Sequence, residues 1–264
     1  MILKSVQYNP INHGQFPFSL PILQTLNKLS FEHPITILVG ENGSGKSTML
    51  EGIAAAANLP VAGGTELHDD IDLIHAKKLA ETLKLSWSYQ TKNGFFLRAE
   101  DFLAFVKRIK AMKQDAEMEL TKIEAEYKNK SAFAKGLASM PHMRTLDELK
   151  GLYNEGLDQR SHGESFLDFF QSRIKPNGLY LLDEPETPLS PMRELSLISI
   201  ILDAVKEGSQ FIIITHSPMI MALPNAHIFS FDTHPPSLIR YEDIEHVQIM
   251  KDFLHSPQTF LRHL

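Results

Sequence analysis

The chain alternates short apolar runs with segments that have the three-to-four-residue spacing of amphipathic helices. Ile35 to Val39 is a continuous apolar run, which predicts a buried parallel strand, and a helix of small and apolar residues extends through Ala57. The same alternation resumes later with a helix from about Gly163, a strand Leu179 to Leu182, a helix Ser190 to Glu207 and a strand Gln210 to Thr215. This order predicts an α/β fold with a mostly parallel sheet and helices on both of its faces.

Other segments do not fit this alternation. The opening 34 residues alternate apolar and polar positions and contain several prolines, which favours short antiparallel strands at a sheet edge. Leu83 to Gln90 and Phe95 to Ala99 flank Asn93-Gly94, which predicts a β-hairpin. Phe102 to Tyr127 has the spacing of a long amphipathic helix. We therefore expect one domain over 1–264, with an inserted helical lobe at about 65–160 that carries the hairpin.

Composition narrows the class of protein. A chain of 264 residues with 43% hydrophobic residues can bury a full core. Its longest apolar runs are far shorter than the roughly 20 residues that span a bilayer, and the N-terminus lacks an export signal. The chain has no cysteine, so it forms no disulfide or thiolate metal site. These features predict a cytoplasmic protein without membrane insertion.

Charge argues against a protein that coats nucleic acid, because the formal net charge is -6. Lys and Arg are in modest excess between Lys107 and Lys135. Such an excess is most often a solvated helix face, and a local contact with DNA stays open as the alternative.

The segment Gly40 to Ser47 reads GENGSGKS and lies between a predicted strand and a predicted helix. It fits the phosphate-binding pattern GxxxxGK[ST] in the context that the pattern requires. Glycines let successive amide groups face phosphates, and the helix N-terminus adds positive charge. Lys46 would hold the β and γ phosphates of ATP, and the Ser47 hydroxyl would bind Mg²⁺. The residues expected to contact the nucleotide here are Asn42, Gly43, Ser44, Gly45, Lys46, Ser47 and Thr48.

The apolar strand that begins at Leu179 ends in two acids, Asp183 and Glu184. Ligands bind at the carboxyl edge of such sheets, so both carboxylates are expected there. Transfer of a phosphoryl group to water needs a metal and a group that orients the water. Asp183 fits the metal role, through a bound water, and Glu184 fits the general base. Acids also commonly follow strands, so the phosphate loop upstream strengthens this interpretation.

The order of four segments resembles the motif series of ABC ATPases: Walker A, signature, Walker B and switch histidine. The segments are GENGSGKS, SHGES at Ser161 to Ser165, LYLLDEPE, and FIIITHS at Phe211 to Ser217. Within that superfamily the chain is more similar to stand-alone bacterial AAA family ATPases, which are related to the cassettes of chromosome-maintenance and recombination proteins, than to transporter cassettes. GFFLRAEDF from Gly94 and the C-terminal sequence from Tyr241 also resemble that group.

The resemblance implies further roles. Ser161 and Gly163 would meet the γ-phosphate of ATP held by the other subunit of a homodimer, and His216 would contact that phosphate or the attacking water. Ser161 and Glu164 also form the pattern of a helix capping box. Both interpretations are compatible, because a capped helix N-terminus is also an anion site.

The sequence departs from the family pattern in places. Arg160 and His162 replace the usual leucine and first glycine of the signature, which puts a close trans-phosphate contact in doubt. Thr187 to Pro191 stands where transporter cassettes have a leucine-aspartate pair. Either Gln90 or Glu100 fits the position of the metal-contacting glutamine. The aromatic residue that stacks on adenine is not fixed, and the candidates are Tyr8, Phe16 and Phe18.

The sequence thus predicts ATP binding and hydrolysis that drive a dimer switch, with an unidentified effector protein as partner. A role in DNA repair or phage defence follows only by analogy. The alternatives are a cytosolic cassette of a membrane transporter and an ATP-gated binding module with slow hydrolysis. A small-molecule kinase would not need the SHGES segment or a switch histidine, which argues against that function.

Overall fold

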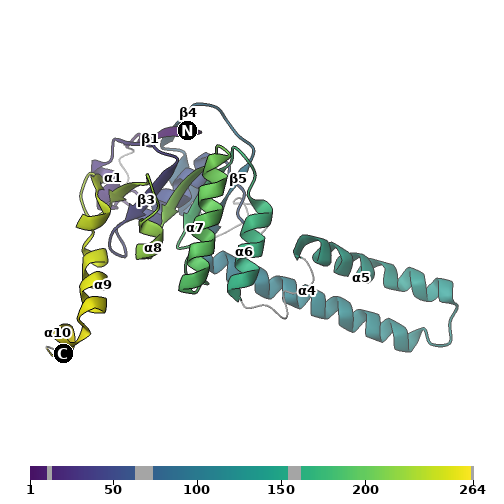
Figure 1. The fold of residues 1–264 in the computed structure, drawn as a ribbon. Helices are drawn as coiled ribbons and strands as arrows, with labels where there is room; N and C mark the ends of the chain where they lie inside the picture. The colour runs from purple at the N-terminus through teal and green to yellow at the C-terminus, as the bar shows by residue number, and fades with distance from the viewer. Residues whose placement is uncertain (11–13, 63–73, 154–161, 263–264) are drawn as a thin grey trace. The chain divides into compact units, whose positions relative to one another are not determined.

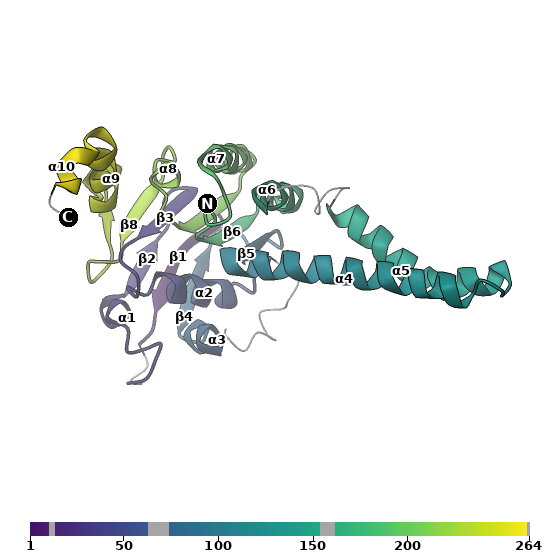
Figure 2. The same ribbon diagram turned by 90° about the horizontal axis from the view of Figure 1, so that it is seen from below.

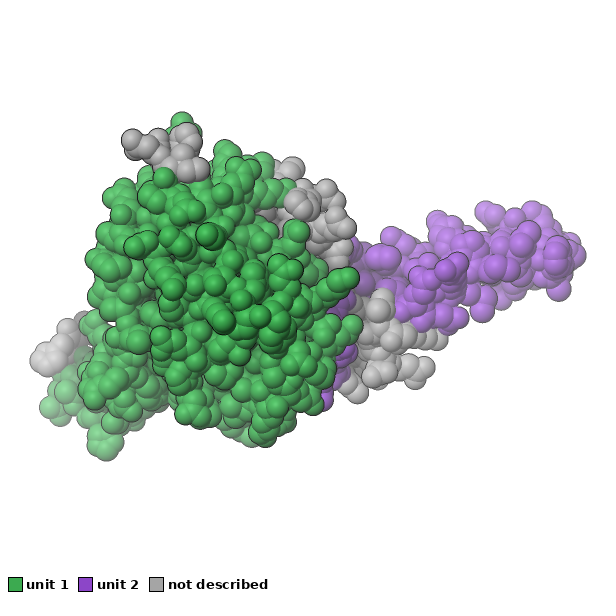
Figure 3. All heavy atoms as spheres, turned by 90° about the horizontal axis from the view of Figure 1, so that it is seen from above, with its two compact units in different colours: residues 1–99, 174–264 green, residues 100–173 purple. Residues whose placement is uncertain are grey.

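The chain forms two compact units, shown in green and purple in Figure 3. A computed structural model describes residues 1–10, 14–62, 74–153 and 162–262. Unit 1 comprises Met1–Ala99 and Ile174–Leu264, and unit 2 comprises Glu100–Arg173. The division differs from the lobe expected at about 65–160, because residues 74–99 pack with unit 1 and the helix that starts at His162 belongs to unit 2.

A six-stranded sheet forms the centre of unit 1, in the order β5-β6-β7-β3-β8-β9. The first five of these strands are parallel, and only β9 pairs antiparallel, with β8. Every residue of β3, β6 and β7 is buried, as continuous apolar runs predict. The strands are β3 (Ile35–Val39), β5 (Gly94–Arg98), β6 (Leu179–Asp183), β7 (Gln210–Ile214), β8 (His227–Ser230) and β9 (Ser237–Ile239).

A second, antiparallel sheet of three strands has the order β2-β1-β4, with β1 at Leu3–Tyr8, β2 at Lys28–Ser30 and β4 at Leu83–Trp87. The hairpin expected around Asn93-Gly94 is therefore wrong, because β4 pairs with β1 whereas β5 pairs with β6. Gly94 instead allows β5 to approach β6 closely. A Cβ at this position would lie 2.0 Å from the carbonyl oxygen of Leu179, so only glycine fits there.

The helices of unit 1 cover the six-stranded sheet on both sides (Figures 1 and 2). Helix α2 lies on one face with α3, and α7 and α8 lie on the other. Their bounds are α2 Lys46–Ala56, α3 Ile74–Ala80, α7 Pro191–Lys206 and α8 Pro218–Met221. The remaining elements of the unit are α1 Pro21–Thr25, the short 3-10 helix η2 Tyr241–Asp243, α9 Glu245–His255 and α10 Pro257–Leu261.

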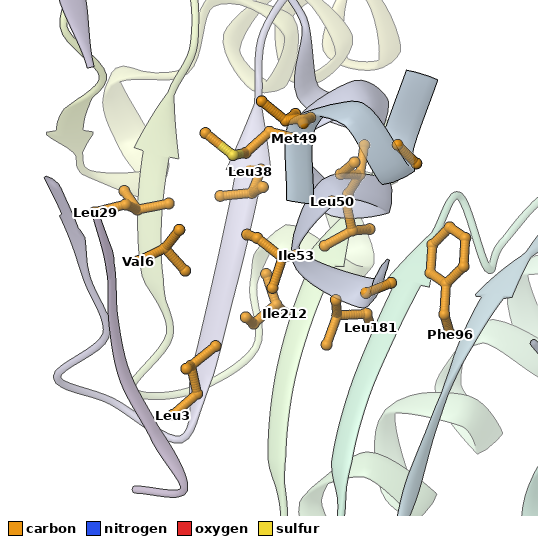
Figure 4. Packing of buried hydrophobic residues seen from close by; sticks show 14 of the residues in the cluster. Leu3, Val6, Leu29, Leu38, Met49, Leu50, Ile53, Phe96, Leu181 and Ile212 are labelled. Atoms are coloured by element: carbon orange, nitrogen blue, oxygen red, sulfur yellow. The ribbon is translucent and has the colours of Figure 1, made fainter. Parts of the chain in front are cut away.

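The main core of unit 1 packs helix α2 between the two sheets (Figure 4). Leu50 and Ile53 of α2 are fully buried, together with Val6 of the small sheet and Ile212 of the large one. Burying such side chains contributes about 1.5–3 kcal/mol each. Because α2 begins at Lys46, this packing fixes the phosphate loop that precedes the helix.

Unit 2 is helical, with α4 (Ala99–Glu126), α5 (Ala132–Tyr153) and α6 (His162–Arg173). The long helix expected at Phe102 to Tyr127 is α4. Within the unit, the buried ring of Phe102 lies 4.9 Å from that of Phe166 and 5.3 Å from that of Phe169, centroid to centroid. None of the helices in the described part of the chain is long and apolar enough to cross a membrane.

Candidate functional site

The candidate site lies at the carboxyl edge of the six-stranded sheet. Because β3, β6, β7 and β8 run parallel, the segments that follow them meet at one edge. Gly40 follows β3, Glu184 follows β6 and His216 closely follows β7. The parallel topology therefore brings together the Walker A loop, the acids and the switch histidine, which are far apart in sequence.

The Walker A loop adopts the backbone conformation that its glycines permit. Gly43 has φ 84° and Gly45 has φ 94°, in the left-handed region that favours glycine. Gly45 also caps α2, and a Cβ on it would lie 2.9 Å from Cγ2 of Ile22. The loop thus leads directly into a helix N-terminus, where amide groups and the helix dipole favour an anion.

Lys46 projects its ammonium group into this loop. Its Nζ donates to the carbonyl oxygens of Gly40 at 2.6 Å and Glu41 at 2.7 Å. Burial lowers the pKa of Lys46, while the negative charges of Asp232, Asp183 and Glu184 act in the opposite direction. The residue is only 6% exposed, so its charge acts in a partly desolvated site, where electrostatic attraction is stronger than in water.

Asp183 and Ser47 are adjacent, as a shared metal site requires. The Ser47 hydroxyl is hydrogen-bonded to the Asp183 carboxylate, whose pKa burial nevertheless raises to about 6. Within the described residues, Asp183 Oδ1 is buried without a hydrogen-bond partner. A carboxylate oxygen without a partner and a hydroxyl are hard oxygen ligands, which Mg²⁺ prefers. These residues therefore fit a magnesium ion.

Glu184 and His216 face each other, with 3.7 Å between Glu184 Oε1 and His216 Nε2. Glu184 has φ 48°, which is uncommon for a residue with a side chain and is often found at functional sites. Its amide donates to the carbonyl oxygen of Ile214 at 2.9 Å, which ties the acid to the end of β7. The two side chains are thus available to act on the same water molecule.

A small cavity of about 180 Å³ adjoins the Walker A loop, and Asn42, Thr48 and Glu184 line it together with Phe16. Phe16 is 46% exposed and its ring edge contacts His75 at 4.7 Å between centroids. Tyr8 is only 4% exposed and Phe18 packs against the core. Of the three aromatic candidates for adenine stacking, Phe16 is the one that lines this cavity.

Some of the predicted site residues are not brought together in this way. Gln90 precedes β5, at the opposite end from Arg98, so it does not reach the carboxyl edge and the magnesium-contacting role does not suit it. Glu100 follows β5 at the correct end, although its side chain lies outside the described part of the structure. Ser161 also lies outside the described residues, and Gly163 belongs to unit 2. Their contact with nucleotide stays a prediction.

Two further charged residues lie at the site without any sequence signal that marked them. Asp232, just after β8, accepts a hydrogen bond from the Glu41 amide at 2.7 Å through Oδ1. Arg98, at the end of β5, lies 3.5 Å from the Glu51 carboxylate, and its charge partly opposes the rise in the pKa of Asp183 that burial causes. Each is held by a partner distant in sequence, so only the folded chain shows that they belong to the site.

Comparison with known proteins agrees with this geometry. The AAA domain family matches residues 17–130. The phosphate import ATP-binding protein PstB of Borreliella burgdorferi is 27% identical over 216 residues, which cover 78% of this chain and 76% of that protein. PstB of Borreliella afzelii is 26% identical over 224 residues, with the same coverage.

The chain is thus similar to ATP-binding proteins over about three quarters of its length. A solved structure with a similar fold is the Smc head domain with an extended coiled coil from Pyrococcus furiosus, bound to the C-terminal domain of ScpA. It is 14% identical, with a TM-score of 0.48, and the match covers 96% of this chain and 99% of the solved one.

Proposed function

We propose that this protein is an ABC-type ATPase, which binds ATP with Mg²⁺, hydrolyses it, and uses the cycle to close and reopen a homodimer. The observation that carries the proposal is the pair of Glu184 and His216, 3.7 Å apart beside the Walker A loop. A protein that only bound ATP would need the loop and its lysine but not a general base next to them.

Each residue has a defined role in this mechanism. Lys46 and the amides of the Walker A loop bind the β and γ phosphates, and Phe16 stacks on adenine. A Mg²⁺ ion held by Ser47 and, through a water, by Asp183 would neutralise phosphate charge. Glu184 accepts a proton from the attacking water. The oxygen of that water forms a bond to the γ-phosphorus, while the bond between the γ-phosphorus and the leaving oxygen of ADP breaks. His216 orients that water or the γ-phosphate.

The dimer part of the proposal rests on the signature segment. Gly163 is buried near the start of α6, a helix whose first turn is the natural place for an anion contact. By its resemblance to the ABC series, this segment would meet the γ-phosphate bound by the partner subunit. The products of hydrolysis would lack that bridging phosphate, so the dimer would reopen.

Replacement of the general base tests the proposal. Glu184→Gln should retain ATP affinity, measured by calorimetry, but hydrolyse ATP at least about a hundredfold more slowly. Because closure needs ATP and reopening needs hydrolysis, this variant should accumulate as a dimer on a sizing column. Glu207→Gln, an exposed position at the end of α7, is the matched control and should behave like the wild type. An active Glu184→Gln protein would disprove the assignment.

A transporter cassette is the second candidate, because the curated relatives named above are phosphate import ATP-binding proteins. The altered signature at Arg160 and His162 and the absence of a leucine-aspartate pair after Glu184 count against it. Co-purification with a membrane permease that stimulates ATP hydrolysis would favour the transporter function. A third candidate, an ATP-gated module with slow hydrolysis, would be recognised by a single-turnover measurement.

The biological output of the cycle stays a prediction from the resemblance. A role near DNA in repair or in phage defence would require an effector or a nucleic acid contact. Binding of DNA should then depend on ATP and on the basic residues of α4, such as Lys107 and Arg108. The negative net charge makes binding by the protein's whole surface unfavourable.

A further inference from the structure

A third acid, Glu186, lies two residues beyond the general base and reaches across to the segment that follows β7. Its Oε1 accepts three hydrogen bonds: from the Thr215 hydroxyl at 2.7 Å, the His216 amide at 2.7 Å and the Ser217 amide at 3.1 Å. One carboxylate oxygen thus holds three consecutive residues, with His216 in the middle.

These donors have no partner in the sheet, because pairing of β7 with β6 and with β3 ends at Ile214. An unpaired buried amide costs about 1–3 kcal/mol, so an acceptor is needed where the sheet ends. Glu186 supplies it. Burial raises the pKa of this carboxyl, and the hydrogen bonds from Thr215, His216 and Ser217 act in the opposite direction.

The residue after His216 is fixed by a second set of contacts. The Ser217 hydroxyl donates to Glu194 of α7 and accepts from the amides of Met219 and Ile220, at 3.2 and 3.3 Å. It therefore caps α8 as well as joining it to α7. The backbone of His216 is therefore held on both sides, which restricts where its imidazole can lie relative to Glu184.

We propose that Glu186 is a positioning residue that sets the place of the His216 imidazole beside Glu184. In this role Glu186 acts on hydrolysis only through His216. The inference rests on the proposed function, since it assigns Glu186 a part in the same ATP hydrolysis. A positioning role differs from a general structural role in one respect: substitution of Glu186 must have no effect on kcat when His216 is absent.

A double-mutant cycle tests this requirement. Glu186→Ala should lower kcat for ATP hydrolysis by about a hundredfold, as small misplacements of catalytic groups do. The affinity for ATP should stay unchanged, because the Walker A loop is not altered. In a His216→Ala background the same substitution should cost less than about threefold, since residues that act as one unit are not additive. Equal losses in both backgrounds would overturn the proposal.

Two variants separate positioning from folding. Glu186→Gln keeps an acceptor oxygen at the same reach and should restore most of the lost kcat. Thr215→Val preserves shape but removes one of the three donors, together with the oxygen that accepts from the Ser217 amide at 3.0 Å. Because the His216 amide keeps its bond to Glu186, the loss of kcat should be smaller and in the same direction. Activity in Glu186→Gln as low as in Glu186→Ala would contradict a role that depends on the acceptor.

A measurement without hydrolysis keeps this inference separate from the proposed function. Diethyl pyrocarbonate modifies imidazoles, and Nε2 of His216 is buried although 41% of the side chain is exposed. Glu186→Ala should make His216 react at least about threefold faster, because the released segment opens locally. Exposed His255 in the same molecule is the reference. An unchanged His216 rate would overturn the positioning role, whereas a wild type without ATP hydrolysis would disprove only the proposed function.

Discussion

At the scale of single residues, the site buries the carboxylate of Asp183, and burial disfavours its charged form. Burial raises the pKa of Asp183 from 3.8 to about 6. The folded protein therefore retains a proton on this carboxyl between about pH 4 and 6, where the unfolded chain has lost it. Above pH 6 the charge is present in the buried site, and the free energy of unfolding is reduced.

Asp183→Asn should remove this reduction in the free energy of unfolding. In metal-free buffer at pH 7.5 we expect the variant to be more stable than the wild type by up to about 3 kcal/mol, which corresponds to a pKa shift of about two units. The gain should decrease below pH 6 and disappear near pH 4, where the carboxyl is protonated in both states. Urea unfolding of both proteins at several pH values measures this difference in stability. A difference at pH 4 as large as that at pH 7.5 would show that the buried charge of Asp183 is not its cause.

The positions of the four central residues of the candidate site were predictable, three of them from local patterns and His216 from the resemblance to the ABC motif series. Lys46 lies within the glycine-rich loop, Asp183 and Glu184 end an apolar strand, and His216 closely follows another. Glu186 and Asp232 gave no such signal. Their partners lie about thirty and nearly two hundred residues away, so only the folded chain shows that they hold the site.

At the scale of elements, buried strands and helices were predictable, but the partner of a strand was not. Strands β3, β6 and β7 appear where continuous apolar runs predicted them. The hairpin at Asn93-Gly94 was wrong, because local turn residues carry no information about distant partners. Here β6, some eighty residues further along the chain, pairs with β5.

Two glycines provide a matched test of this explanation. Gly94→Ala should destabilise the protein by at least about 2 kcal/mol, because its φ is 138° and its Cβ would clash with the Leu179 carbonyl oxygen. Gly136→Ala, within α5 and with open space around its Cβ, should instead stabilise by up to about 1 kcal/mol. Thermal unfolding of both variants measures these changes in stability. An unchanged stability in Gly94→Ala would argue against the close approach of β5 and β6.

At the scale of the whole molecule, the proposed site is shared between two chains. Unit 1 holds Lys46, Asp183, Glu184 and His216, whereas Gly163 of the signature segment belongs to unit 2. In a closed dimer, each ATP would be bound by the Walker A loop of one subunit and by the signature of the other. Two inactive variants with different defects should therefore restore one complete site when they are mixed.

The most direct measurement is the ATPase activity of such a mixture. Glu184→Gln would lack the proposed base, and Gly163→Asp would place a carboxylate against the γ-phosphate in the proposed dimer, so each is expected to be inactive alone. Calorimetry first establishes that both still bind ATP. Random mixing makes about half of the dimers mixed, each with one intact site, so activity should reach roughly a quarter of wild type if the sites act independently. Heterodimers proved by mass spectrometry, but no more active than the parent variants, would contradict the shared site.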